Sequence, residues 1–178
     1  GTVYVADDER DGARVALKVI HRHLLRDRQI NRRFNREARI LSSLRGEHLV
    51  ALLDFGEGED GLLYMALELV GGDPLDRLMQ DGPQPPARAA DVVRQICAAL
   101  AVAHAEGVVH RDLKPGNGLV ERRDDGTDHV RVLDFGIAKL IRGSPSASLN
   151  ALTEQNMVFG TPEYMAPEQA RGDDVDAR

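Results

Sequence analysis

Residues 110–117 read His-Arg-Asp-Leu-Lys-Pro-Gly-Asn, and residues 134–136 read Asp-Phe-Gly after an apolar run. An aspartate carboxylate and an asparagine carboxamide on adjoining loops form a hard-oxygen ligand set, which suits Mg²⁺ that keeps waters and phosphate oxygens as its other ligands. A loop aspartate such as Asp112 can also orient or accept the proton of a hydroxyl group, and a nearby lysine such as Lys114 can offset charge on a phosphoryl group. The two stretches therefore indicate chemistry on phosphates.

The two stretches differ in how specific they are. Asp-Phe-Gly alone is a weak signal, because many strands end in a polar turn. The pattern His-Arg-Asp-x-Lys-x-x-Asn is strong, because several residue types are specified together at fixed offsets. The catalytic interpretation therefore depends mainly on residues 110–117.

Outward from this region, the chain changes character at Gly71-Gly72-Asp73-Pro74, which we interpret as a boundary between two lobes. Strand patterns dominate before it and helical patterns after it, so the sequence predicts an α+β fold. The predicted strands are 14–20, 49–55, 62–67, 119–122 and 130–133, the last two forming a hairpin, and the predicted helices are 29–44 and 85–105. The second helix is predicted to bury a stripe formed by Val93, Cys97, Leu100 and His104.

Two charged residues stand in apolar patterns. Lys18 lies inside the Val/Leu-rich strand, and Glu37 lies on the apolar stripe of the first helix. Each is costly to bury alone, so the two either pair with each other or extend separately to solvent. A strand lysine held by a helix carboxylate could present its charge to phosphates.

The bulk composition excludes several classes of protein. With 178 residues, 42% hydrophobic and 29% charged, the chain is the size of one globular domain. It has no apolar run near the roughly 20 residues of a membrane span, and its single cysteine, Cys97, excludes internal disulfides and cysteine-rich zinc sites. The net charge is −6, although residues 21–45 carry eight arginines. Such a block could bind nucleic acid, but without stacking aromatics we favour a solvated helix face.

These motifs together resemble the catalytic domain of bacterial serine/threonine protein kinases. Val-Ala-Leu-Lys ending at Lys18, the His-Arg-Asp loop, Asp-Phe-Gly and Ala166-Pro167-Glu168 occur in the order of the protein-kinase signature set. Lys114 and the Gly-Thr-Pro-Glu-Tyr of residues 160–164 are typical of the serine/threonine class. The resemblance implies a two-lobed α+β fold, with a small antiparallel sheet and one helix in the first lobe and mainly helices in the second.

The resemblance also implies where the lobes begin and end. Residues 1–67 would form the first lobe without its first strand, residues 68–72 the hinge, and residues 73–178 an incomplete second lobe that stops after the activation segment. We expect a cytoplasmic protein whose parent is anchored to a membrane, if at all, through segments outside this sequence. The isolated segment is expected to have little or no activity.

The resemblance assigns roles residue by residue. The catalytic residues would be Asp112 toward the substrate hydroxyl, Lys114 toward the γ-phosphate, Lys18 toward the α- and β-phosphates, and Glu37 holding Lys18. Nucleotide-binding residues would be Gly1, Val3, Ala16, Lys18, Glu68, Val70 and Leu119, with Leu67 at the gatekeeper position. Asn117 and Asp134 would bind metal, and a spine of Leu41, Leu52, His110 and Phe135 would keep the lobes in register. Regulatory residues would be Arg111, Thr153 and Thr161. Gly118 departs from the family pattern, which usually has Ile, Val or Leu there.

The implied function is transfer of the γ-phosphoryl group of ATP to Ser or Thr of protein substrates, with Mg²⁺, or Mn²⁺ as an alternative. The implied partners are protein substrates and no nucleic acid, with dimerisation for trans-autophosphorylation. The alternative is a pseudokinase that keeps the fold without turnover. Each catalytic position present in the sequence is intact, which favours the enzyme. Thr153 is expected to be phosphorylated in the activation segment and to pair with Arg111.

Overall fold

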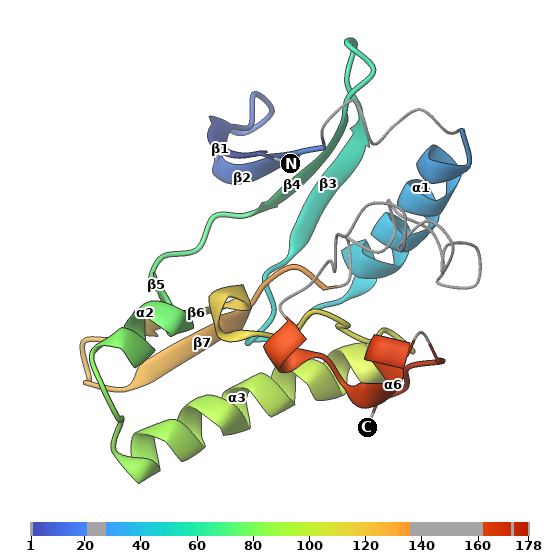
Figure 1. Ribbon diagram of the computed structural model, residues 1–178. Coiled ribbons are helices and arrows are strands. Elements are labelled where there is room, and N and C mark those ends of the chain that lie inside the picture. Colours follow the sequence, from blue (N-terminus) through green and yellow to red (C-terminus); the bar gives the residue numbers. More distant parts are fainter. Residues whose placement is uncertain (1, 21–27, 136–161, 172, 178) are drawn as a thin grey trace. The chain divides into compact units, whose positions relative to one another are not determined.

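The computed structural model describes residues 2–20, 28–135, 162–171 and 173–177 (Figure 1). The chain divides into two compact units. The described part of the first unit comprises residues 2–45 and 50–70, without 21–27. The described part of the second comprises residues 46–49, 71–135, 162–171 and 173–177.

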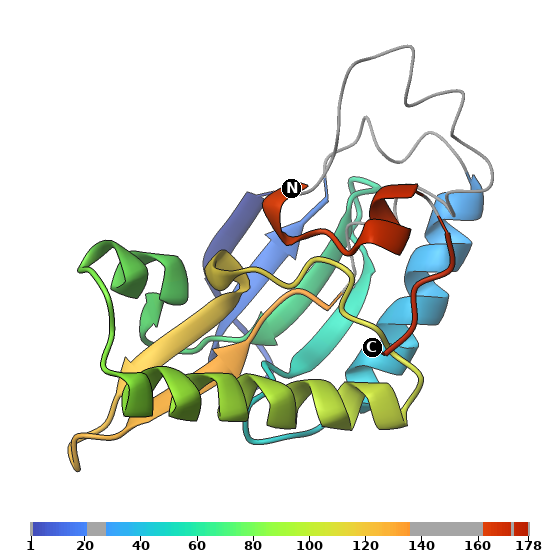
Figure 2. The ribbon, with the colours of Figure 1, turned by 60° about the horizontal axis from the view of Figure 1, so that its bottom comes forward.

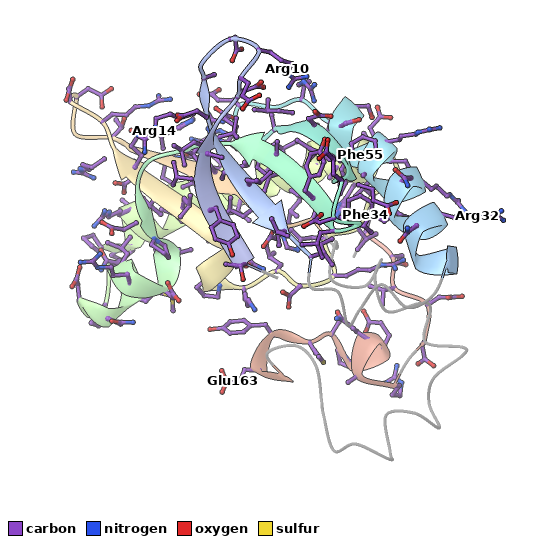
Figure 3. The ribbon with its side chains drawn as sticks, turned by 90° about the horizontal axis from the view of Figure 1, so that it is seen from above. Arg10, Arg14, Arg32, Phe34, Phe55 and Glu163 are labelled. Carbon is purple, nitrogen blue, oxygen red and sulfur yellow. The ribbon has the colours of Figure 1, made fainter. Side chains whose placement is uncertain are left out.

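The first unit is an antiparallel sheet with one helix. The strands are β1 Thr2–Asp7, β2 Arg14–Val19, β3 Leu52–Glu57 and β4 Leu63–Glu68, in the order β1-β2-β4-β3. Helix α1, Arg28–Ser43, lies beside β3 (Figure 1). Phe34 of α1 meets Phe55 of β3 edge to face, with ring centroids 6.2 Å apart (Figure 3). Burial of these apolar side chains is what attaches the helix to the sheet.

The second unit combines helices with a small three-stranded sheet. Its elements are β5 Asp73–Pro74, α2 Leu75–Gln80, α3 Pro86–Ala105, the short 3₁₀ helix η2 Pro115–Asn117, β6 Gly118–Arg122, β7 Asp128–Val132, the 3₁₀ helix η4 Pro162–Tyr164 and α6 Pro167–Arg171. The sheet has the order β5-β6-β7 and is antiparallel. Figure 2 shows α3 running alongside β7, and Val92 of α3 packs with Val120 and Val130 in the core between them.

The predicted elements are largely confirmed, with two corrections. Residues 49–51 do not belong to the third strand, which begins at Leu52; instead Leu49 forms an isolated parallel bridge with Val132 of the second unit. The predicted stripe of α3 is wrong. Val93 and Cys97 are exposed, and the helix buries Val92, Gln95, Ala99 and Ala103.

The corrected face of α3 has a physical reason. The carboxamide of Gln95 donates to the backbone oxygen of Asp128 at 2.9 Å and accepts from the backbone nitrogen of Val130 at 2.8 Å. A buried amide that satisfies two backbone groups of β7 is stable in the core, whereas hydropathy alone scores it as a surface residue. The helix is therefore rotated so that Gln95 faces the sheet.

Within the described residues, no helix is long and apolar enough to span a membrane.

Candidate active site

The loop that precedes β6 holds Asp112 by both of its flanking peptide groups. The Asp112 amide donates to Nδ1 of His110 at 3.3 Å, and the Asp112 carbonyl oxygen accepts from Nδ2 of Asn117 at 2.8 Å. The same Asn117 nitrogen lies 3.2 Å from Oδ2 of Asp112. Lys114 places its ammonium 3.4 Å from that carboxylate oxygen. Asp112, Lys114 and Asn117 therefore lie together, and their role in handling phosphate stays a prediction.

His110 is a structural residue of this loop. Its Nε2 lies 2.8 Å from the carbonyl oxygen of Leu133, and its ring packs on Phe135 with centroids 4.7 Å apart. A carbonyl oxygen can only accept, so Nε2 carries the proton and Nδ1 is left to accept from Asp112. Burial lowers the pKa of the imidazole, which keeps it in this neutral form. His110 thereby connects the loop of residues 110–117 to the residues around Asp134.

Asn117 and Asp134 fit a divalent cation by the chemistry of their donors. The backbone oxygen of Asn117 accepts from the amide of Leu133 at 2.8 Å, which ties the loop to the residue preceding Asp134. The Asn117 nitrogen is committed to Asp112, so its carboxamide oxygen is the atom suited to a metal. Among the described residues no group of three or more His, Cys, Asp or Glu could hold a metal. Two oxygen ligands suffice for Mg²⁺, which keeps several waters.

Two backbone conformations in this region are unusual. Arg111 and Asp134 have φ angles of 63° and 58°, in the left-handed region. Such conformations are costly for residues with a Cβ and persist where surrounding contacts hold them. Arg111 directly precedes the predicted catalytic Asp112, and Asp134 is itself a predicted metal-binding residue.

The remaining predicted site residues lie mostly in the first unit. Lys18 is on β2 and Glu37 is on α1, and both are half-buried. The pairing of the two side chains stays a prediction. Ala16 lies opposite Leu67 in the register of β2 and β4. The Glu68 amide donates to the Ala51 oxygen at 2.9 Å.

Other predicted residues are placed as follows. Val3 lies on β1 with its side chain exposed, Val70 follows β4, and Leu119 lies on β6 in the second unit. Leu41 and Leu52 are buried in the first unit. Gly1, Thr153 and Thr161 lie outside the described residues.

A comparison with protein families decides the classification. The model described as "Protein kinase domain" matches residues 1–177. The chain belongs to the protein kinase domain family.

Bacterial kinases are among the relatives of this kinase domain. It is 46% identical over 165 residues to the serine/threonine-protein kinase pkn3 of Myxococcus xanthus, covering 92% of this chain and 30% of that protein. It is 42% identical over 180 residues to PknB of Mycobacterium leprae, covering 99% of this chain and 28% of that protein. The chain thus spans less than a third of the length of these curated relatives.

A solved structure confirms the predicted fold class. The kinase domain of Mycobacterium tuberculosis PknI matches with a TM-score of 0.74 at 29% identity, covering 98% of this chain and 62% of that one. The fold is the two-lobed α+β fold of protein kinases, over about three fifths of that domain's length.

Sequence reasoning missed one polar contact beside the catalytic loop. Nε2 of Gln169, on α6, donates to the backbone oxygen of Arg111 at 2.7 Å. A single glutamine carries no periodic or charge signal, so nothing in the sequence singles it out.

Proposed function

We propose that this kinase domain transfers the γ-phosphoryl group of ATP to serine or threonine hydroxyl groups of proteins, with Mg²⁺. The observation that carries the proposal is the convergence of Lys114 and Asn117 on the carboxylate of Asp112. Relatives named serine/threonine-protein kinases, at 41–46% identity, support the hydroxyl class of acceptor.

Asp112 is the group that receives the substrate. Its carboxylate would accept a hydrogen bond from the incoming hydroxyl and orient the oxygen toward the phosphorus atom. Oδ2 of Asp112 lies 3.4 Å from the ammonium of Lys114. Lys114 is then also placed to stabilise negative charge on the transferred group.

Asn117 and Asp134 would hold the metal, which when bound neutralises charge on the phosphate oxygens. Asn117 serves two purposes, because its nitrogen fixes Asp112 while its oxygen remains for the cation. In the first unit, Lys18 would bind the α- and β-phosphates, and Ala16, Leu67 and Glu68 would line the adenine site. Ala16 is small enough to leave room for the ring.

The test is an Asp112→Asn variant of the protein expressed from its complete reading frame. Asparagine keeps the size but is a poor base, so phosphoryl transfer should fall by roughly 100-fold or more while ATP affinity changes little. Asp124→Asn, in the exposed turn between β6 and β7, is the matched control and should be fully active. Full activity of Asp112→Asn would remove the assignment, and an inactive parent that still binds Mg·ATP would favour the pseudokinase.

A further inference from the structure

The peptide group between Arg111 and Asp112 is held from both sides. On one side, the Asp112 nitrogen donates to Nδ1 of His110 at 3.3 Å. On the other, the Arg111 oxygen accepts from Nε2 of Gln169 at 2.7 Å. Because a peptide group is planar, these two contacts together fix the rotation of the plane from which Asp112 begins.

This peptide needs external support. Arg111 has a φ angle of 63°, which is unfavourable for a residue with a Cβ relative to the right-handed region. Without restraint, the peptide would rotate toward a conformation that redirects the Asp112 side chain. His110 belongs to the same loop and can move with it. Gln169 lies 58 positions further along the chain, so its contact comes from outside the loop.

The segment that carries Gln169 has backbone bonds of its own. In α6 the Ala170 amide donates to the Ala166 oxygen at 3.0 Å, and the Asp173 amide donates to the Glu168 oxygen at 2.9 Å. Gln169 itself is half-buried. Its nitrogen must be the atom that faces Arg111, because the acceptor is a carbonyl oxygen and only the NH₂ group can donate to it.

We propose that Gln169 is a positioning residue for phosphoryl transfer: by donating to the Arg111 carbonyl it holds the left-handed peptide that aims Asp112 at the substrate hydroxyl. The proposal rests on the proposed function for its kinetic consequence. Its structural part, the restraint of the 111–112 peptide, is independent of turnover. Gln169 touches no reacting atom and acts through Arg111 and Asp112.

The decisive variant is Gln169→Glu, which keeps the size of the side chain and removes the donor. It should lower kcat at least about fivefold, the equivalent of one lost hydrogen bond, and leave the KM for ATP unchanged. Gln169→Lys keeps a donor and should recover most of the loss. Gln80→Glu, on the exposed end of α2, is the control for the added charge and should behave like the parent.

The second measurement is amide hydrogen exchange of Asp112 by NMR in the protein expressed from its complete reading frame. Loss of the Gln169 donor should speed exchange of this amide, because the peptide that carries it can then rotate away from His110. Unchanged kcat in Gln169→Glu, or a rise in KM for ATP equal to the fall in kcat, overturns the positioning role. If Asp112→Asn remains active, the proposed function fails by itself. The exchange of the Asp112 amide still decides whether Gln169 restrains the loop, because an unchanged exchange rate in Gln169→Glu overturns the restraint.

Discussion

The guanidinium of Arg88 on α3 makes a two-pronged contact with the carboxylate of Asp128, the first residue of β7. Its Nε lies 2.6 Å from Oδ2 and its Nη2 lies 3.1 Å from Oδ1. Arg122 adds a third bond to Oδ1 at 2.9 Å. Hydrogen bonding to Arg88 lowers the pKa of Asp128, and the same contact raises that of Arg88. The side chain of Asp128 is only 3% exposed, so the helix and the β6–β7 hairpin depend on one buried carboxylate.

We therefore predict that Asp128→Asn destabilises the chain by at least about 2 kcal/mol, since it removes a buried charge and leaves its partners short of an acceptor. Arg88 is 30% exposed and can regain some hydration, which keeps the loss below that of a fully buried pair. Asp73→Asn is the matched control. That residue pairs with Arg77 at 2.8 Å on the surface and should cost no more than about 0.5 kcal/mol. Urea unfolding at neutral pH compares the two, and equal losses would contradict the prediction.

His129, next in β7, has guanidinium groups at both ring nitrogens. Nη2 of Arg123 lies 2.9 Å from Nδ1, and Nε of Arg131 lies 3.1 Å from Nε2. A neutral imidazole can accept at only one nitrogen, so an added proton has no favourable position. The ring of His48 is 5.3 Å away, and the one carboxylate near a ring nitrogen is Glu47, 3.9 Å from Nδ1, among the described contacts. Glu121 lies opposite on β6.

The chain should accordingly lose stability as the pH falls below about 6.5, the ordinary pKa of histidine. Burial lowers the pKa of His129, with Arg123 and Arg131 adding to the effect. The unfolded chain therefore binds a proton at a pH where the folded chain does not, so stability is complete above pH 6.5 and falls below it.

His129→Gln should reduce the fall in the urea midpoint between pH 7.5 and pH 5.5, because glutamine does not titrate. Part of the fall will remain, since burial lowers the pKa of His110 as well. His104→Gln, near the end of α3, should show the full pH dependence of the parent. A His129→Gln chain as pH-sensitive as the parent would show that this cluster is not the origin.

The sequence predicts the grouping of side chains in residues 110–117 well because its information is local, while their catalytic roles stay predictions. Residues 110–117 carry their chemistry at fixed offsets, and the structure brings Asp112, Lys114 and Asn117 together as expected. The β6–β7 hairpin follows in the same way from the turn at Gly126, whose φ angle of 80° suits glycine.

What the sequence does not predict depends on pairing with distant backbone. Gln95 and Gln169 are both polar residues that hydrogen-bond a distant backbone group. The partner lies 33 positions away for Gln95 and 58 positions away for Gln169. Hydropathy ranks both as surface residues, which is why the buried face of α3 was predicted incorrectly. Leu49 is a similar case, because its bridge to Val132 ends the strand pattern before β3.

Gly118 begins β6 directly after the metal-binding candidate Asn117. It is buried with φ −117° and ψ 128°, a conformation open to any residue. A Cβ there would meet only ordinary contacts, the nearest being the Pro115 oxygen at 3.7 Å and Leu75 Cβ at 3.8 Å. Beside it lies a cavity of about 210 Å³ whose lining includes Leu75, Ile96 and Val132.

Gly118→Ala should therefore stabilise the chain by about 0.4–1 kcal/mol, because it restricts the unfolded chain and adds no strain to the folded one. Gly118→Val should add to this by filling part of the apolar cavity, at about 0.8 kcal/mol for each buried carbon.

Gly72→Ala is the opposite case within the same unit. Its φ angle is 102°, and a Cβ would lie 2.6 Å from the Val120 backbone oxygen, so we expect a loss of at least about 1–3 kcal/mol. The urea midpoints of the three variants give the order of their stabilities. A loss of stability in Gly118→Ala like that in Gly72→Ala would contradict the prediction. The loop before β6 would then require glycine at position 118 for its conformation. The departure from the family pattern would not be a simple packing defect.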